Sequence, residues 1–364
     1  MPLPILPDLL VPLDPARPEP IHRQLYRGIR EAILAGGLPA GVRIPSTRRL
    51  AEQLGISRST VLVAFDQLVA EGYLVGAVGS GSYVARDIPQ HLRRSPVPGN
   101  GDERPKSPRV AARVARVARA GGRAVPAVPY PNAFWSGVPP IDVFPMAAWN
   151  RIVARRLRSL EPADLHHGPA AGYRPLREAI AAYLVAARGM RCSADQVIVL
   201  ASAQEALELA ARVLLDPGDA AWMEEPGWSG ARGAFVSADI RIVPVPVDAD
   251  GLDVAAGLAA APDARAVYLS PSHQYPLGAT LGLERRMALL DWAARSGAWL
   301  IEDDYDSEFR YSGRPLTALH GLDSRGSVIY VGTFNKTMFP ALRVGYLVVP
   351  EALVESFLTL RRLG

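Results

Sequence analysis

One lysine is the first residue whose chemistry stands out. The sequence contains 40 Lys+Arg residues, and all of them except Lys106 and Lys336 are arginine. Arginine supplies surface charge, but it does not form an imine and is not deprotonated in a protein. Lysine does both, and covalent attachment of an aldehyde cofactor requires an amine of this kind. Lys336 is therefore our candidate for such an attachment.

Lys336 lies in a polar turn between two apolar runs. The stretch from 327 to 350 reads SVIYVGTFNKTMFPALRVGYLVVP, so strand-like segments precede and follow the turn. Three other polar groups also follow strand-like segments, namely Ala201-Ser202-Ala203-Gln204, Ser270 to Gly278, and Glu302 to Asp306. Each group alone has an ordinary explanation, because a carboxylate after a strand often caps a helix and a lone lysine is usually solvated.

Strands and helices alternate beyond residue 135. Short apolar runs predict buried strands at 196–200, 220–223, 240–247, 266–269 and 298–301, and amphipathic patterns predict helices such as 175–189. This alternation predicts an α/β domain with a mostly parallel sheet covered on both faces. Because ligands of such sheets bind at the carboxyl ends of the strands, we expect the polar groups to converge there.

Brought together, these groups fit one cofactor. A lysine holds the aldehyde of pyridoxal 5'-phosphate as an imine, a carboxylate keeps the pyridine nitrogen protonated, and a phenol donates to the ring oxygen. An arginine and the N–H groups of a helix N-terminus bind the phosphate. The sequence offers a residue of each type after a predicted strand.

The arrangement resembles the aspartate-aminotransferase fold, also called fold type I. The resemblance implies that Lys336 forms the aldimine, Asp303 pairs with the pyridine nitrogen and Tyr305 contacts the ring oxygen. It also implies that the phosphate is bound by Arg343, Thr333, Ala203 and Gln204. Trp228 is implied to lie against the ring, and His273 or Gln274 to approach the ring oxygen. In an enzyme of this kind Lys336 is the catalytic residue.

The first third of the chain carries the excess of positive charge. Residues 1–125 contain 18 Lys+Arg against 10 Asp+Glu, and the remainder contains 22 against 26. An anionic partner is therefore expected for the first third. An amphipathic helix is predicted at 19–35, followed by two short helices joined at Gly55 and a glycine-containing hairpin from Tyr73 to Val84. These elements predict a winged helix-turn-helix.

The second of the short helices begins with the residues Ser57, Arg58, Ser59 and Thr60. Hydroxyls and an arginine at a helix N-terminus suit phosphate oxygens and base edges. The alternative is that Ser57 only caps the helix and that Arg58 is solvated. The glycine turn, the upstream arginines and the glycine-rich wing together favour DNA binding.

The segment from Pro20 to Gly81 resembles the winged helix of GntR-type bacterial regulators. The residues that carry the resemblance include GVRIPSTR at 41–48, LGISRSTV at 54–61 and GSG at 79–81. The resemblance implies a double-stranded DNA operator as partner, contacted by Arg48, Ser57, Arg58, Ser59, Thr60 and the wing residue Gly79. Leu62 stands where this family often has a basic contact residue.

A linker rich in proline, glycine and arginine is predicted between the two domains. The predicted boundaries are 1–86 for the DNA-binding domain, 87–131 for the linker and 132–364 for the large domain. Within the linker, RVAARVARVARA at 109–120 can form a short arginine-striped helix. A solvated tether is the favoured interpretation of this stretch, and additional phosphate contacts to DNA are the alternative.

A GntR-type winged helix joined to a fold type I domain resembles the MocR-type regulators. The resemblance implies a homodimer that uses pyridoxal phosphate, alone or with an amino compound, to change how it holds its operator. Asn335, Ser202 and His167 stand where serine, glycine and tyrosine are usual. Members of this family continue past the position that matches Gly364, with a small C-terminal subdomain and an arginine that holds a substrate carboxylate, so we expect this sequence to be either a fragment or a protein without that arginine.

We favour a regulator that uses the cofactor over two alternatives. One is an active pyridoxal-phosphate-dependent aminotransferase with an accessory DNA-binding arm, and the other is a regulator whose large domain is only a dimerisation scaffold.

Hydrophobic residues at 49% and charged residues at 21% fit a soluble globular protein. The single Cys192 excludes an internal disulfide and fits a reducing cytoplasm. No secretion signal, membrane span or metal site is predicted.

Overall fold

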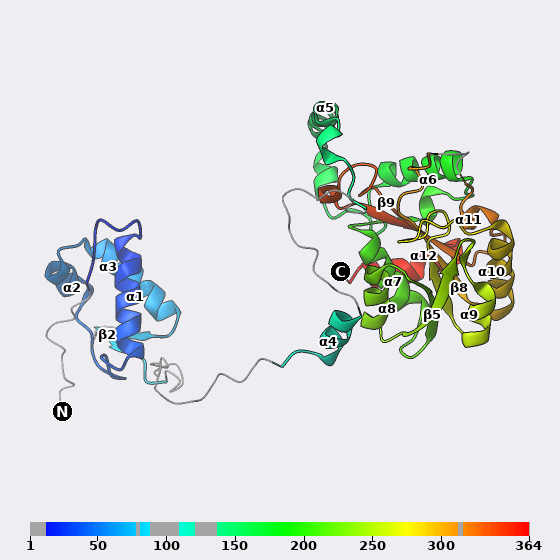
Figure 1. The fold of residues 1–364 in the computed structure, drawn as a ribbon. Coiled ribbons are helices and arrows are strands. Elements are labelled where there is room, and N and C mark those ends of the chain that lie inside the picture. The colour runs from blue at the N-terminus through cyan, green and yellow to red at the C-terminus, as the bar shows by residue number, and fades with distance from the viewer. Residues whose placement is uncertain (1–11, 78–80, 88–108, 121–136, 312–315, 364) are drawn as a thin grey trace. The chain divides into compact units, whose positions relative to one another are not determined.

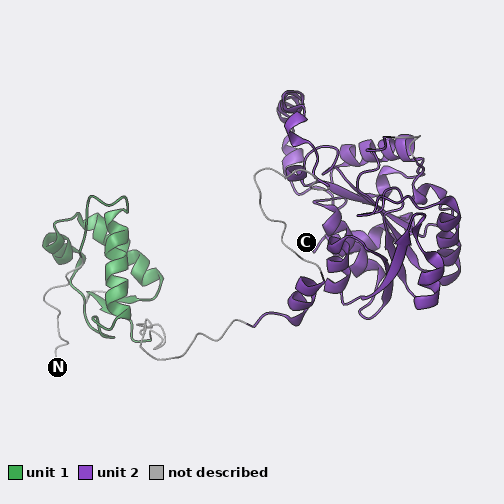
Figure 2. Cartoon of the chain, viewed as in Figure 1, with its two compact units in different colours: residues 1–108 green, residues 109–364 purple. Residues whose placement is uncertain are grey.

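The computed structural model describes residues 12–77, 81–87, 109–120, 137–311 and 316–363. The chain forms two compact units, residues 1–108 and residues 109–364 (Figure 2). Each unit has its own hydrophobic core. No helix within the described ranges is long and apolar enough to cross a membrane. The domain boundaries predicted from the sequence stay a prediction.

The described residues of the N-terminal unit form three helices and a β-hairpin (Figure 1). They are α1 (Ile21–Leu34), α2 (Thr47–Leu54), α3 (Arg58–Ala70) and the antiparallel strands β1 (Leu74–Ala77) and β2 (Gly81–Val84). Gly55 ends α2 in the left-handed conformation, with φ of 66°, and turns the chain towards α3. The core contains Leu25, Ile29, Leu50 and Phe65. The predicted winged helix-turn-helix is confirmed.

An eight-stranded sheet lies at the centre of the second unit, in the order β3-β10-β9-β8-β7-β4-β5-β6. The strands are β3 (Val197–Leu200), β4 (Ala220–Glu225), β5 (Arg241–Asp248), β6 (Gly251–Leu252), β7 (Ala266–Leu269), β8 (Trp299–Asp304), β9 (Val328–Thr333) and β10 (Gly345–Val348). Strands β5, β4, β7, β8 and β9 pair in parallel, whereas β10 is antiparallel to both β3 and β9. The predicted α/β class with a mostly parallel sheet is confirmed.

Helices cover both faces of this sheet. One core cluster joins the sheet to α7 (Ala203–Leu214), α8 (Ser229–Ser237) and α12 (Val354–Arg361). The other core cluster joins it to α9 (Val254–Ala260), α10 (Leu283–Ser296) and α11 (Leu319–Leu322). Helix α6 (Arg174–Arg188) packs near β3. Short 3-10 helices occur at Ile141–Val143, Pro162–Leu165, Ala194–Gln196, Pro340–Leu342 and Glu351–Leu353.

The ends of β3 and β9 meet the start of β10 at one edge of the sheet. Gly345 pairs with Leu200 on one side and with Thr333 on the other. A Cβ atom at Gly345 would lie 2.7 Å from the carbonyl carbon of Ser202 and 2.9 Å from the backbone nitrogen of Ala203. Only glycine permits this approach, which brings the N-terminus of α7 directly against the edge.

The arginine-striped stretch forms helix α4 (Ala112–Arg119), which packs against α8 (Figure 1). Arg116 forms an ion pair with Asp239, just after α8. Val117 lies opposite Gly233, since a Cβ atom built on Gly233 would be 3.7 Å from Cγ1 of Val117. The predicted arginine-striped helix is confirmed, and none of its residues is buried although one side of it contacts α8, so the predicted linker stays a prediction.

Helix α5 (Met146–Arg158) has no buried residue, and Figure 1 shows it extending away from the sheet. Aromatic contacts fix its base. The ring centroid of Phe339 lies 4.9 Å from that of Phe144 and 5.5 Å from that of Trp149. Since Phe339 follows Lys336 by three residues, the base of α5 is packed against the lysine turn.

Candidate functional site

Lys336 lies in the turn after β9, at the carboxyl-end edge of the sheet. Its Nζ donates a hydrogen bond to the carbonyl oxygen of Gly137. Burial lowers the pKa of Lys336, against the opposing effect of the carboxylates of Asp306 and Asp303. A lowered pKa increases the fraction of neutral amine, which is the form that reacts with an aldehyde.

Asp303 is the carboxylate of β8 with an unused oxygen. The Tyr268 hydroxyl donates to its Oδ2 at 2.7 Å, whereas its buried Oδ1 has no hydrogen-bond partner. Burial raises the pKa of Asp303 to about 7, although the Tyr268 hydrogen bond and the charge of Lys336 act in the opposite direction. A buried acceptor without a donor costs folding free energy. The hydrogen bonding of this oxygen is therefore incomplete in the folded chain.

The neighbouring carboxylates of β8 are already engaged. Successive strand residues point to opposite faces, so Glu302 and Asp304 both point away from the side of Asp303. Glu302 accepts hydrogen bonds from the backbone N–H groups of Leu319 at 2.7 Å and His320 at 2.8 Å. Asp304 forms a buried ion pair with Arg188 at 2.7 Å. Within β8, Asp303 is the carboxylate with a buried oxygen that has no hydrogen-bond partner.

Tyr305 follows β8 and is half-buried between two rings. The His273 ring stacks on it with centroids 6.1 Å apart, and the Tyr275 ring meets it edge-on at 6.3 Å. Burial raises the pKa of Tyr305, so its phenol stays protonated and able to donate. His273 is itself fixed by a 2.8 Å contact between its Nδ1 and Oδ2 of Asp306.

Gln274 lies beside His273, but its side chain is engaged by other groups of the protein. Its side chain is buried, and its Nε2 donates to the carbonyl oxygens of Pro226 at 2.9 Å and Tyr275 at 2.6 Å. Its Oε1 accepts from the backbone N–H of Leu277 at 3.1 Å. Of the two residues predicted to approach the ring oxygen, His273 is the one that contacts Tyr305.

An anion cradle lies where α7 begins. Ser202 caps this helix by accepting from the Glu205 N–H at 3.1 Å, and the first N–H groups of a helix, here those of Ala203 and Gln204, lack intrahelical partners. Thr333 lies against the same edge, and its Oγ1 accepts from the Asn335 N–H at 3.2 Å. The N–H groups of Ala203 and Gln204 and the helix dipole suit a phosphate, whereas the Thr333 hydroxyl donates to the carbonyl oxygen of Val344 at 3.4 Å.

Arg343 precedes β10 at this edge in a left-handed conformation, with φ of 53°. Its side chain is exposed, and it forms no ion pair with any residue that the structure describes. A non-glycine residue with positive φ is uncommon and is often found at functional sites. The guanidinium is therefore available for an anion.

Trp228 is the N-cap residue of α8. Its ring lies against Gly230. A Cβ atom built on Gly230 would be 2.4 Å from the Trp228 ring and 2.8 Å from Oε1 of Gln204. The Trp228 and Gln204 side chains therefore meet above Gly230. This places the predicted ring contact beside the anion cradle.

The residues present fit pyridoxal phosphate. A protonated pyridine nitrogen is a donor, and Asp303 Oδ1 is a buried acceptor that lacks one. The raised pKa of Asp303 is what burial without a cationic partner produces, and a bound pyridinium would lower it. The amine of Lys336 and the anion cradle supply the other two recognition features.

The predicted DNA-contact residues gather at the start of α3. Ser57 caps the helix by accepting from the Thr60 N–H at 3.1 Å, and its Oγ lies 2.8 Å from Oγ of Ser59. Arg58 donates to Oγ1 of Thr47 at 3.4 Å, which ties the two helices of the motif together. Arg48 is exposed and pairs with Glu52 on α2. The predicted contact Gly79 lies outside the described residues.

Two family models match the chain. The aminotransferase class I and II model matches residues 150–364, and the model of the gntR family of bacterial regulatory proteins matches residues 21–84. The probable rhizopine catabolism regulatory protein MocR of Rhizobium meliloti is 43% identical over 95% of this chain and 68% of its own length. The chain belongs to the MocR-type transcriptional regulators. The pyridoxine biosynthesis regulator PdxR of Corynebacterium glutamicum is 36% identical over 98% of this chain and 72% of its own length.

Two of the solved structures that resemble this MocR-type regulator are aminotransferases. The multiple substrate aminotransferase of Thermococcus profundus superimposes with a TM-score of 0.60 and 28% identity, covering 70% of this chain and 64% of the enzyme. The kynurenine aminotransferase of Pyrococcus horikoshii gives 0.58 and 29%, covering 62% of this chain and 58% of the enzyme. The chain thus spans less than two thirds of either enzyme. The aminotransferase alternative is not favoured, because the relatives that match both units are named as regulators.

Sequence reasoning missed three groups at the site of this MocR-type regulator. They are the Tyr268 hydroxyl, the Gly137 carbonyl and the Arg188 guanidinium. A signal existed for Tyr268, since a tyrosine in a fully apolar strand needs a partner for its hydroxyl. For Gly137 and Arg188 the pattern along the chain gave no signal.

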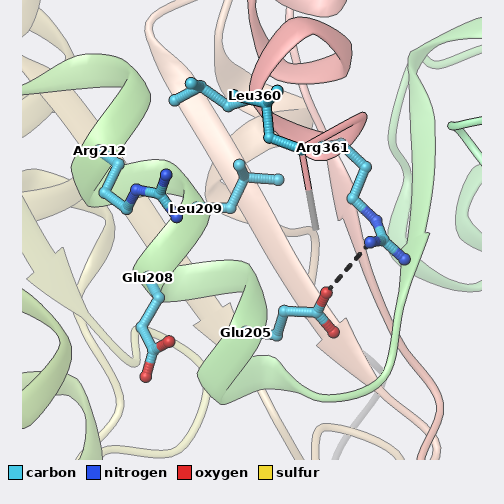
Figure 3. Close-up of a pocket in the computed structure, with 7 residues that line it drawn as sticks. Glu205, Glu208, Leu209, Arg212, Leu360 and Arg361 are labelled. Atoms are coloured by element: carbon cyan, nitrogen blue, oxygen red, sulfur yellow. Dashed lines mark ion pairs between the residues drawn. The ribbon is translucent and has the colours of Figure 1, made fainter. Parts of the chain in front are cut away.

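A pocket between α7 and α12 lies apart from these residues (Figure 3). It is lined by Glu205, Glu208, Leu209, Arg212, Leu360, Arg361 and Leu363. Arg361 approaches Glu205 at 3.6 Å across it. The pocket contains none of the predicted cofactor residues, so it is not part of the candidate cofactor site.

Proposed function

We propose that this MocR-type regulator binds pyridoxal 5'-phosphate in its second unit and uses the bound cofactor to change how the winged helix-turn-helix holds operator DNA. The observation that carries the proposal is the unpartnered Oδ1 of Asp303, buried at the same sheet edge as Lys336. A donor at this oxygen completes its hydrogen bonding, and a protonated pyridine ring is such a donor.

Pyridoxal phosphate supplies an aldehyde that reacts with amines and a ring that withdraws electrons. Lys336 provides the amine, and its lowered pKa keeps more of that amine neutral. Asp303 accepts the ring N–H, while Tyr268 holds the second carboxylate oxygen. Tyr305 donates to the ring oxygen, because its raised pKa keeps the phenol protonated.

The phosphate is bound by the cradle at the start of α7. The N–H groups of Ala203 and Gln204 would hold it, and Thr333 and Arg343 lie at the adjoining strand ends. Trp228, the N-cap residue of α8, would lie against the ring. A helix N-terminus combined with a guanidinium favours a doubly charged phosphate over a neutral group.

A compound with a primary amine is the effector class that fits, because it competes with Lys336 for the same aldehyde. A ligand shifts the DNA-binding arrangement only if it binds one arrangement better than another. Lys336 offers such a difference, since its amine donates to the carbonyl of Gly137 in this structure and is the group with which an amino compound competes. Gly137 directly follows residues 121–136, which connect α4 to the cofactor-binding part of the chain.

A homodimer is the assembly that the surface supports. Helix α5 extends from the second unit with no buried residue, and Met146, Ile152 and Leu157 on it are 50%, 51% and 62% exposed. Exposed apolar side chains along one projecting helix suit contact with a second copy of the chain. A two-fold dimer also fits an operator with two half-sites.

The proposal is tested by adding pyridoxal phosphate to the purified chain, reducing with borohydride and mapping the modified peptide. We expect visible absorbance before reduction and a covalent mass increase on the peptide that contains Lys336. Lys106 is the matched control, because it is the other lysine of the chain. Attachment to Lys106 at an equal level, or no attachment at all, contradicts the proposal.

A further inference from the structure

Two apolar side chains are exposed on the outward face of α3. Leu62 is 39% exposed and Val63 is 49% exposed, although both follow closely on the polar first turn of the helix. The opposite face is buried, with Val61 and Phe65 in the core of the N-terminal unit. Leu62 and Val63 are therefore not needed to fill the core, and they face water in the isolated chain.

The position of these residues on α3 matches the surface that enters a DNA groove. Leu62 and Val63 follow Ser59 by three and four residues, so they lie one turn further along the same side of the helix. This separation is about 5–6 Å along the axis, which is less than two base-pair steps of about 3.4 Å. In a helix-turn-helix the start of the second helix meets the base edges. Leu62 and Val63 therefore reach the next base pairs.

Asp66 limits this surface on its far side. It is exposed on α3 one turn beyond Leu62 and Val63. A carboxylate is repelled by the phosphates that line the groove, so close contact with DNA ends before this turn. From Arg58 to Asp66 the outward face thus presents hydroxyl groups first and aliphatic groups second.

Leucine and valine side chains have no donor or acceptor, so they cannot read the nitrogen and oxygen edges of bases. The major groove offers them one apolar group, the 5-methyl of thymine. We propose that Leu62 and Val63 form an apolar reader of thymine methyl groups. The operator then carries thymine beside the base pair that faces Ser59. This inference rests on the operator binding proposed above and specifies its sequence chemistry.

The test uses the full-length protein. Binding sequences are selected from random duplex DNA, and each thymine of the selected half-site is replaced by deoxyuridine, which removes only the methyl group. We expect an affinity loss of about fourfold for each contacted methyl, at one or two adjacent positions. In the Leu62→Ala, Val63→Ala double variant, thymine and uracil bind equally at those positions.

Val69→Ala is the matched control, because Val69 is a 44% exposed apolar residue in the last turn of the same helix. This variant keeps the full preference for thymine. Leu62→Arg is expected to move the preference from thymine towards guanine, which accepts from arginine at O6 and N7. Thermal unfolding checks that each surface variant is folded.

The outcomes separate the inference from the proposed function. If no sequence is selected from random DNA, operator binding itself fails. If a sequence is selected but uracil is tolerated at every position, or if the thymine preference survives in the double variant, the apolar reader is overturned while operator binding stands.

Discussion

The two units present their functional groups in opposite ways. In the N-terminal unit the residues at the start of α3 are exposed and bond to one another, and Gln24 is the buried polar side chain among its described residues. In the second unit Asp303 is 4% exposed and Lys336 is shifted in pKa by burial. The N-terminal unit keeps its polar chemistry in water, and the second unit withdraws a carboxylate and an amine from water.

This difference follows from the two ligands. DNA phosphates bind through cations and hydroxyls that exchange counterions and water at a surface, so burial is not needed. The proposed cofactor needs a neutral amine and a carboxyl group whose pKa suits the ring nitrogen. Burial shifts the pKa values of both groups. The second unit therefore carries a stability cost at its site that the first does not.

The largest effect is expected from the ion pair of Arg188 and Asp304, which are 4% and 1% exposed. Arg188→Ala leaves Asp304 charged and buried, which costs about 3–5 kcal/mol. Hydrogen exchange should show lost protection within residues 197–360 and unchanged protection within residues 21–84. The control is Arg285→Ala, since Arg285 pairs with Asp248, which is 53% exposed, and a pair with one partner in water should contribute less to stability than a fully buried pair. Equal losses in both variants would show that burial does not distinguish these pairs.

Asp303→Asn should stabilise the cofactor-free chain more at pH 8 than at pH 5. Burial raises the pKa of Asp303 from 3.8 to about 7, so the folded chain favours the protonated acid and loses stability as pH rises between these values. Asparagine removes this loss but leaves an amide donor unpaired, so the net gain at pH 8 is about 1–3 kcal/mol. Thermal midpoints from pH 5 to pH 8 measure it.

The control for this pH dependence is Asp248→Asn. Arg285 lowers the pKa of Asp248, so that group is ionised throughout the range and the variant should show a flat difference from pH 5 to pH 8. A flat difference for Asp303→Asn as well would mean that Asp303 is ionised in the folded chain. The same variant should also bind pyridoxal phosphate more weakly, which links the stability cost to the cofactor site.

Arg58→Ala should weaken operator binding by about tenfold at low salt and reduce the magnitude of the salt dependence by about 0.9 in a log–log plot, as the loss of one phosphate contact does. Cofactor attachment should be unchanged. Arg23→Ala removes the same charge from the exposed side of α1 and is the control. Equal effects of the two variants would mean that the net charge of the unit, and not the start of α3, determines affinity.

The smallest effect is expected from Ser57→Ala, which removes the N-cap of α3 and costs about 1 kcal/mol in the N-terminal unit. Ser202→Ala removes the cap of α7, which is buried, and should cost at least as much in the second unit. Chemical denaturation of the two variants compares the caps. A larger loss for Ser57→Ala would contradict the contrast between exposed and buried groups.

Much of the fold could be predicted because it depends on neighbouring residues. Ser46, Gly55 and Ser57 mark the ends of α2 and α3, and the structure shows all three in capping positions. The antiparallel direction of β10 could not be predicted, since an apolar run carries no direction. The docking of α4 also could not, because Arg116 meets a partner 123 residues away.

The site shows the same limit. A carboxylate after the β8 run was predictable, but Asp303 and Asp304 are adjacent and alike in sequence. What separates them is Arg188, which lies 116 residues from Asp304 in the chain and engages it. The Tyr268 hydroxyl, 35 residues before Asp303 in the chain, donates a hydrogen bond to Asp303 and so distinguishes the two carboxylates further. The roles of the predicted site residues stay predictions until cofactor binding is measured.

The most direct test compares operator affinity with and without pyridoxal phosphate in the wild type and in Lys336→Ala. We predict that the cofactor changes the affinity of the wild type by about 5–150-fold, the usual range of coupling between two sites, and leaves that of the variant unchanged. An unchanged wild type, or an equal change in both proteins, would contradict a coupling that runs through Lys336.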